Sequence, residues 1–120
     1  MSLYDDIGGA AAIDQGVDVF YRKMLKDDRV AHFFDDIPME EQRNKQKAFL
    51  SFALGGPGDY TGKDMREGHA HLLERGLADE HVDIVVGHLG DTLTELGVTA
   101  DVVSQVAAAA ESFRNDILGR

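Results

Sequence analysis

The sequence predicts an all-α protein. Apolar residues recur at spacings of three and four through most of the 120 residues, which is the pattern of amphipathic helices. Only two prolines interrupt the chain, and glycines stand in pairs where one periodic segment gives way to the next. A chain of this length has room for one modest hydrophobic core, so we expect a single domain over residues 1–120.

The first two helices are predicted from their ends. Ser2 with Asp5 has the spacing of a helix cap, and Gly8-Gly9 breaks the short helix that follows the cap. A longer helix then begins near Ala10 and ends around Asp27-Asp28. One stripe of this helix carries Ile13, Val17, Phe20, Tyr21 and Met24. A hydroxyl, that of Tyr21, therefore lies within a face that should be buried.

The middle of the chain predicts a short segment and one further helix. Phe33-Phe34 lies in the short segment, and Pro38 has the place of a first-turn proline. Acidic residues 40 and 41 follow it, near the positive end of the helix dipole. We expect this helix to run to about Leu54, where the glycine-rich stretch 55–58 stops it.

The remaining helices follow a loop that contains residues 60–62. They are predicted at residues 64–75, 79–96 and 100–118. Gly76 separates the first pair, and residues 97–99 separate the second.

Composition excludes several classes of function. The chain has 12 Lys and Arg against 22 Asp and Glu, a net charge of -10, which argues against binding to nucleic acid or to an anionic membrane. It has no cysteine, so disulfides, thiol nucleophiles and thiolate ligands are excluded. The chain starts without the basic and apolar stretches of a signal peptide and has no apolar run of membrane-spanning length, so we expect a cytoplasmic protein.

Two amides interrupt the apolar face of the helix after Pro38. That face carries Met39, Gln42, Gln46, Phe49, Leu50 and Ala53. A buried amide without partners costs about 1–3 kcal/mol, so the face should meet a hydrogen-bonding group. A structural explanation is also open, in which Gln42 lies at the wet end of the helix and Gln46 bonds a backbone carbonyl.

The five histidines differ in their surroundings. In the helix predicted at 64–75, His69 shares a stripe with Met65, Leu72 and Leu73, whereas His71 points about half a turn away. His69 therefore faces inward, either as a satisfied core residue or as a metal ligand. We interpret His81 and His88 as surface or structural residues.

Taken together, these elements resemble a known family. Gly8-Gly9, Phe20-Tyr21, Phe33-Phe34, the two glutamines, Gly55-Gly56 and the segment 65–69, with the sequence Met-Arg-Glu-Gly-His, occur in the order and at the intervals of the group I truncated haemoglobins. The resemblance covers essentially the whole chain. It implies the truncated (2-on-2) globin fold, in which two antiparallel helix pairs cross over a heme b (iron protoporphyrin IX).

The resemblance also implies roles for single residues. His69 would be the proximal iron ligand, and Phe34 would pack against the porphyrin face. Tyr21, Gln42 and Gln46 would form the distal polar cluster that hydrogen-bonds a gas ligand. The haem neighbours would be Phe34, Lys45, Phe49, Tyr60, Met65, Arg66 and His69. For Tyr60 and Arg66 the alternatives are a packed loop ring and an ordinary surface cation.

Three positions depart from relatives within the family. Lys45 stands where some relatives have an iron-binding histidine and others an iron-binding lysine. A neutral Lys45 would serve as a sixth iron ligand, and a charged one would reach a haem propionate or water. Phe113 matches the place of a histidine that becomes joined to haem in some relatives, so we expect no covalent bond. Leu50 replaces a bulky aromatic residue that gates a gas tunnel elsewhere.

Four functions follow as hypotheses. The first is nitric oxide dioxygenation, in which the protein turns nitric oxide and dioxygen into nitrate and depends on a separate reductase. The second is storage, scavenging or sensing of dioxygen, nitric oxide or carbon monoxide. The third is electron transfer or redox sensing with Lys45 on the iron. The fourth is a helical interaction domain without haem.

Overall fold

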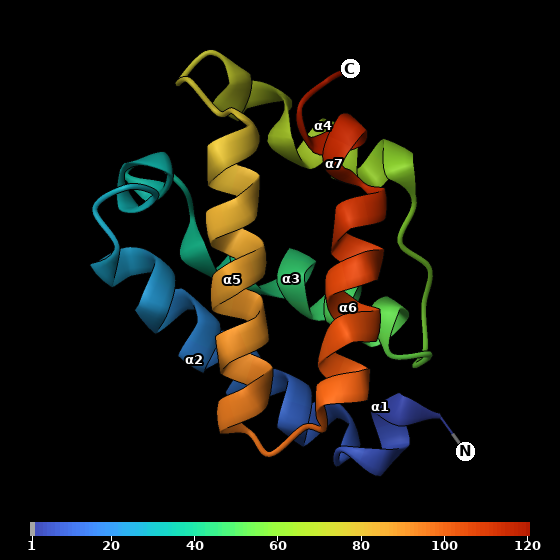
Figure 1. Cartoon of the computed structure of the whole chain (residues 1–120). Helices are drawn as coiled ribbons and strands as arrows, with labels where there is room; N and C mark the ends of the chain where they lie inside the picture. Colours follow the sequence, from blue (N-terminus) through green and yellow to red (C-terminus); the bar gives the residue numbers. More distant parts are fainter. Residues whose placement is uncertain (1) are drawn as a thin grey trace.

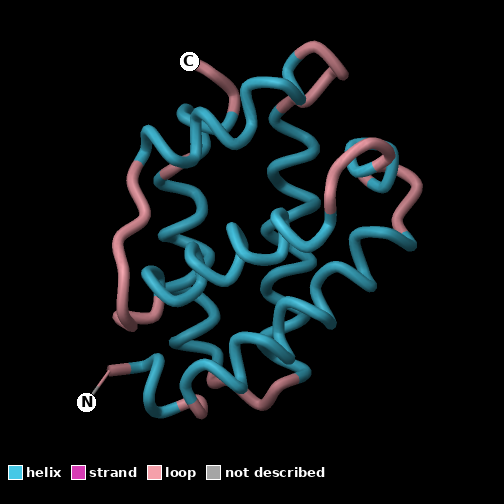
Figure 2. The backbone as a smooth tube through the Cα atoms, turned by 180° about the vertical axis from the view of Figure 1, so that it is seen from behind, coloured by secondary structure: helices cyan, strands magenta, loops and turns pink. Residues whose placement is uncertain are grey.

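The computed structural model describes residues 2–120, and within them it contains helices and loops but no strand (Figures 1 and 2). The elements are α1 (Leu3–Asp6), α2 (Gly9–Lys26), the 3₁₀ turn η1 (Ala31–Phe34), α3 (Met39–Ala53), α4 (Gly62–Leu73), α5 (Asp79–Glu95), α6 (Ala100–Ser112) and α7 (Arg114–Ile117). None of the helices in this range has the length and hydrophobicity that a membrane crossing requires.

The four long helices form two antiparallel pairs. Lys47 of α3 pairs with Asp14 of α2, at 2.9 Å, and one turn earlier on α3 Arg43 pairs with the later residue Asp18. Helices α5 and α6 run side by side in opposite directions in the front of Figure 1. The two pairs meet where α2 packs on α5, and there Lys23 bonds Glu95 at 2.7 Å. This arrangement confirms the predicted 2-on-2 fold.

The predicted helix ends are largely confirmed. The Ser2 hydroxyl accepts a hydrogen bond from the Asp5 amide at 3.2 Å. Gly8 and Gly55 flank α2 and α3 with φ of 117° and 78°, values at which glycine avoids the strain of a Cβ. Pro38 is the residue before α3 rather than within its first turn. Helix α4 starts at Gly62, earlier than predicted, because Thr61 and Asp64 cap each other's backbone.

The prediction of one continuous helix over residues 100–118 is wrong. Helix α6 ends at Ser112, and α7 begins at Arg114 on the other side of Phe113. The Phe113 ring packs edge-on against Phe49, with centroids 6.0 Å apart, and against Tyr60, at 6.2 Å. These contacts join distant parts of the chain, and neither glycine nor proline marks the break.

The hydrophobic core lies between the two helix pairs. Its most deeply buried side chains are Val17, Val30, Leu50, Leu54 and Val106, together with the hydroxyl residue Thr92. The Thr92 hydroxyl donates to the carbonyl of His88 at 2.7 Å, so its burial leaves no polar group unsatisfied. Leu73, predicted on the inward stripe, is 37% exposed, whereas its neighbour Leu72 is buried.

Candidate functional site

A largely apolar cavity lies between α2, η1, α3, α4 and α5. About 1020 Å³ of space lies among its lining residues, including the part that is open to solvent. Its apolar walls include Phe20, Met24, Phe33, Phe34, Leu72, Val85, Val86 and Leu89. The lining therefore suits a mainly apolar ligand.

Tyr21 and Gln42 form a polar pair in this cavity. Tyr21 is 3% exposed, and its hydroxyl accepts a hydrogen bond from the Gln42 side-chain amide at 3.2 Å. The same hydroxyl donates to the backbone carbonyl of Gln42 at 3.4 Å. Burial raises the pKa of Tyr21 well above its ordinary value, and the bond from Gln42 offsets only part of that rise. The hydroxyl consequently stays protonated and keeps its ability to donate.

Gln46 lies one helical turn after Gln42 and lines the same cavity. It is half-buried, and the structure gives its side chain no hydrogen bond to any residue within 2–120. The alternative in which the Gln46 side chain bonds a backbone carbonyl is therefore not observed within residues 2–120. An amide that points at a cavity without a protein partner is available to a ligand.

His69 of α4 presents one ring nitrogen to the cavity. Its Nδ1 donates to the Met65 carbonyl at 2.8 Å, which identifies Nδ1 as the protonated nitrogen because a carbonyl only accepts. Nε2 then keeps its lone pair, and no described residue bonds it. Burial lowers the pKa of His69, an effect that the Met65 carbonyl opposes and that nearby His71 and Lys45 reinforce. A neutral imidazole with a bare Nε2 is the form that binds a metal.

The other histidines have different positions. His71 is exposed, as predicted. His81 accepts a hydrogen bond on Nδ1 from the Ala78 amide at 2.9 Å, and His88 bonds the Asp27 carboxylate at 2.7 Å. Both therefore have structural partners, although His81 also reaches the cavity wall. Among the described residues, no group of three or more His, Asp or Glu side chains has the geometry of a metal site.

The predicted aromatic neighbours all line the cavity. Phe34 is half-buried and stands edge-on to Tyr21, with ring centroids 5.6 Å apart. Phe49 packs edge-on against Tyr60 at 5.7 Å, and the Tyr60 hydroxyl contacts the Met65 sulfur at 3.9 Å. These side chains come from η1, α3, the loop before α4 and α4 itself, so the fold brings together residues that are far apart in sequence.

The two predicted cationic neighbours are placed differently. Lys45 is exposed, and it lines both the cavity and a second, more open hollow beside it. Arg66 lines neither of them. Its guanidinium bonds Asp116 at 3.1 Å and the carbonyl of Arg120 at 3.1 Å. The structure thus places Lys45 at the cavity and Arg66 against the last helix.

Helix α5 also contributes to the cavity, which the sequence alone did not predict. Val82, Val85, Val86 and Leu89 line it from one face of that helix. Their spacing of three and four residues is a signal for an inward face, but it does not distinguish a cavity wall from an ordinary core. Only the packing of α5 on α2 assigns these side chains to the site.

The donor set satisfies the requirements of an iron porphyrin. The cavity offers apolar walls for the macrocycle and a neutral imidazole nitrogen for the metal. The hydroxyl and amides on α2 and α3 suit a small polar ligand. Residues that include members of α2, η1, α3, α4 and α5 would hold the group, and among them His69 has a ring nitrogen that no described residue bonds.

Comparison with known proteins shows which family the chain is similar to. Residues 2–118 match the model of the family described as bacterial-like globin. The chain is 46% identical, over 99% of its length and 98% of the relative's, to a group 1 truncated hemoglobin of Synechocystis sp.. It superposes with a TM-score of 0.91 on the crystal structure of a 2/2 hemoglobin from Synechococcus sp. in the cyanomet state with covalently attached heme, at 41% identity and full coverage of both chains. The truncated hemoglobin of Tetrahymena pyriformis in its Fe(III) form gives a TM-score of 0.86 at 40% identity, again with full coverage.

Proposed function

The chain belongs to the bacterial-like globins as a group I truncated haemoglobin, and from that membership we propose how its residues bind haem and act on a gas. As a globin it carries haem and binds dioxygen and related small gas ligands. The iron supplies a coordination position for a diatomic molecule and an electron for its reduction. What the protein adds is the orientation of these partners and the polarity of the pocket.

In our proposal, His69 is the proximal ligand of the haem. The supporting observation is its Nδ1 bond to the Met65 carbonyl, which fixes the ring and leaves Nε2 facing the cavity. Phe34, Phe49, Tyr60 and Met65 pack around the porphyrin. The haem is held without a covalent bond, because Phe113 offers no nucleophile where some relatives have a reactive histidine.

The distal residues act on the gas. Tyr21 would turn its single O–H proton from the Gln42 carbonyl to the partly negative end of a dioxygen molecule, while the side-chain amide of Gln42 holds the Tyr21 hydroxyl in place. Gln46, whose side chain has no partner among residues 2–120, supplies a second donor. The activity that this arrangement supports best is nitric oxide dioxygenation. In that reaction nitric oxide, dioxygen and one electron would give nitrate, and a separate reductase would have to restore the electron.

A stopped-flow experiment tests the activity. The ferrous protein is saturated with dioxygen, mixed with nitric oxide, and followed by haem absorption and nitrate yield. We expect nitrate in a one-to-one ratio to the haem oxidised, at a rate far above that of free haem. A rate equal to that of free haem would exclude the dioxygenase activity and leave gas storage or sensing.

Replacement of the proximal side chain tests the haem site. The variant His69→Ala should lose haem or bind it with an altered absorption spectrum and altered carbon monoxide binding. His71→Ala is the matched control, because His71 belongs to the same helix but is exposed. Retention of haem with an unchanged spectrum in His69→Ala would refute the proposed ligand.

One observation favours a second candidate function. Lys45 lines the cavity, so a neutral Lys45 amine would reach the iron and make the protein an electron-transfer or redox-sensing haem protein. This candidate predicts a low-spin ferric spectrum that strengthens as pH rises and is lost in Lys45→Ala. An unchanged spectrum in that variant would leave Lys45 as a cation near a propionate or in water.

A further inference from the structure

The helix that carries His69 has one main helical neighbour. Among the helices of residues 2–120, only α7 packs extensively on α4, and Figure 1 shows the two together near the carboxyl end of the chain. The other long helices, by contrast, pack on one another. The position of α4 relative to the cavity therefore depends on a short segment at the end of the fold.

The contacts between α4 and the segment 114–120 are specific. The Arg66 guanidinium donates to Asp116 Oδ1 and to the Arg120 carbonyl, both at 3.1 Å. A Cβ added at Gly62 would lie 2.7 Å from Asp116 Oδ2, so this carboxylate sits directly against the first turn of α4.

These contacts flank His69 on one stripe of α4. Gly62, Arg66, His69 and Leu73 are spaced by four, three and four residues, which places them on the same side of a helix. Asp116 contacts the first two of these residues, because it lies against Gly62 and accepts a hydrogen bond from Arg66. At the other end of the stripe, a Cβ added at Gly119 would lie 2.9 Å from the Leu73 side chain. The segment 114–120 thus fixes the rotation of α4 about its axis, and that rotation decides where the imidazole points.

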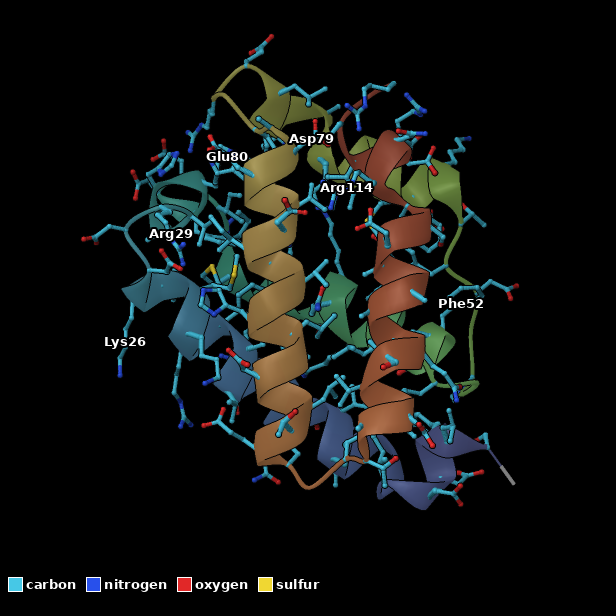
Figure 3. The ribbon with its side chains drawn as sticks, viewed as in Figure 1. Lys26, Arg29, Phe52, Asp79, Glu80 and Arg114 are labelled. Atoms are coloured by element: carbon cyan, nitrogen blue, oxygen red, sulfur yellow. The ribbon has the colours of Figure 1, made fainter. Side chains whose placement is uncertain are left out.

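The segment is itself tied to the start of α5. Arg114, whose side chain is 18% exposed, bonds Asp79 at 3.1 Å and also pairs with Asp83 and Glu111. Arg120 adds a bond to Asp79 at 3.0 Å. In Figure 3, Arg114 and Asp79 lie close together beside the upper end of α5. Ion pairs thus join the segment 114–120 to α5, which lines the cavity, and the bonds of Arg66 to Asp116 and to the Arg120 carbonyl join the same segment to the helix of His69.

We infer that Asp116 is a positioning residue for His69, which it orients by fixing the rotation of α4 through Arg66 and the close contact with Gly62. This inference rests on the proposed role of His69 as the iron ligand. Asp116 touches neither haem nor gas in this role. Ordinary surface ion pairs are the alternative, since the Arg66 and Asp116 side chains are 45% and 30% exposed and such pairs typically add little to stability.

Hydrogen exchange of the haem-loaded protein separates the two explanations. In Asp116→Asn we expect the amides of α4 to exchange about two- to fivefold faster, which is the effect of losing one partly exposed pair, with no change in α2 or α3. Glu74→Gln is the matched control, because it removes an exposed carboxylate at the end of α4. Unchanged exchange in α4, or an equal rise in every helix, would overturn the inference.

A second variant disturbs Asp116 without changing charge. Gly62→Ala places a methyl group against the Asp116 carboxylate, and the end of that side chain must move aside. An ordinary Gly→Ala change favours a helix, so faster exchange in α4 would be opposite to the propensity effect. Gly87→Ala is the control, since a Cβ there meets no atom within 4 Å. Slower exchange in α4 of Gly62→Ala would count against the positioning role.

The iron–histidine stretching vibration tests whether the contacts of Asp116 with α4 affect the orientation of His69. In the ferrous, gas-free protein, the iron–histidine stretching band should shift or broaden in Asp116→Asn and Gly62→Ala and match the wild type in both controls. A band that stays fixed while α4 exchange rises would reduce Asp116 to a structural residue. If His69 were not the iron ligand, a different result would show it: His69→Ala would keep an unchanged haem spectrum.

Discussion

The polarity of the pocket depends on the hydroxyl group of Tyr21. It lies on a helix face that is otherwise apolar, and burial alone would make an unpaired hydroxyl there unfavourable. Gln42 resolves this by giving the hydroxyl both a donor and an acceptor. Since burial also raises the Tyr21 pKa, the group stays a donor throughout the pH range in which proteins work.

Replacement of Tyr21 by phenylalanine should weaken the hold on gas. We expect dioxygen to leave Tyr21→Phe about tenfold faster, because a single hydrogen bond in such a site contributes roughly 1–1.5 kcal/mol. The measurement is the dissociation rate of dioxygen from the ferrous protein. Tyr4→Phe is the control, as Tyr4 packs on the glycines beside α1 rather than in the cavity. Equal rates in both variants would remove Tyr21 from the distal cluster.

At the scale of the helix, the Asp27 carboxylate links the end of α2 to α5, in addition to the pair of Lys23 with Glu95. Asp27 follows α2, and it accepts hydrogen bonds from Arg29 at 2.7 Å and from His88 of α5 at 2.7 Å. The bonds from Arg29 first, and then that from His88, hold the pKa of Asp27 well below its usual 3.8. The depressed pKa means that the folded protein prefers the charged carboxylate.

This link predicts a particular dependence on pH. A carboxylate with a depressed pKa stabilises the fold fully above about pH 4, and that contribution is lost as pH falls below the unfolded value. Asp27→Asn should therefore lower the free energy of unfolding at neutral pH and have less effect under acid conditions. Urea unfolding across pH measures the difference. Asp28→Asn, a neighbouring exposed change, should show no such trend, and a flat difference for Asp27→Asn would contradict the assignment.

The inward face of α5 carries a large part of the packing energy. Leu93 is 2% exposed and lies outside the cavity lining, so Leu93→Ala removes core contacts without opening the ligand site. We expect a loss of about 2–5 kcal/mol in the free energy of unfolding. Leu25→Ala is the matched control because Leu25 is 47% exposed, and it should change stability by less than about 0.5 kcal/mol. Urea denaturation of both variants tests the contrast, and equal losses would refute it.

At the scale of the whole molecule, the cavity separates elements that would otherwise form one core. Its lining comes from both helix pairs and from η1 and α4, so a ligand that fills it contacts all of them. A ligand that binds only the folded state stabilises that state in proportion to the logarithm of its concentration relative to the dissociation constant. Haem is therefore part of the core as well as the reactive group.

Removal of haem should lower the stability of the fold. With haem at about a thousand times its dissociation constant, we expect a difference of roughly 4 kcal/mol in the free energy of unfolding between loaded and haem-free protein. His69→Ala should shrink that difference. Chemical denaturation followed by helical circular dichroism measures it. Equal midpoints with and without haem would contradict a cavity that the cofactor completes.

The sequence by itself determined the class of fold, most helix ends and the side of the helix on which His69 lies. Hydrophobic spacing and glycine pairs act locally, and so they fix which residues share a face. The likeness of the residue order to a known family then attached roles to those faces.

Only the tertiary structure decided the break at Phe113, the partners of Arg66 and the part that α5 takes in the cavity. Each of these depends on contacts between segments far apart in the chain. Local periodicity specifies that a face is buried, but the packing of whole helices selects what it is buried against.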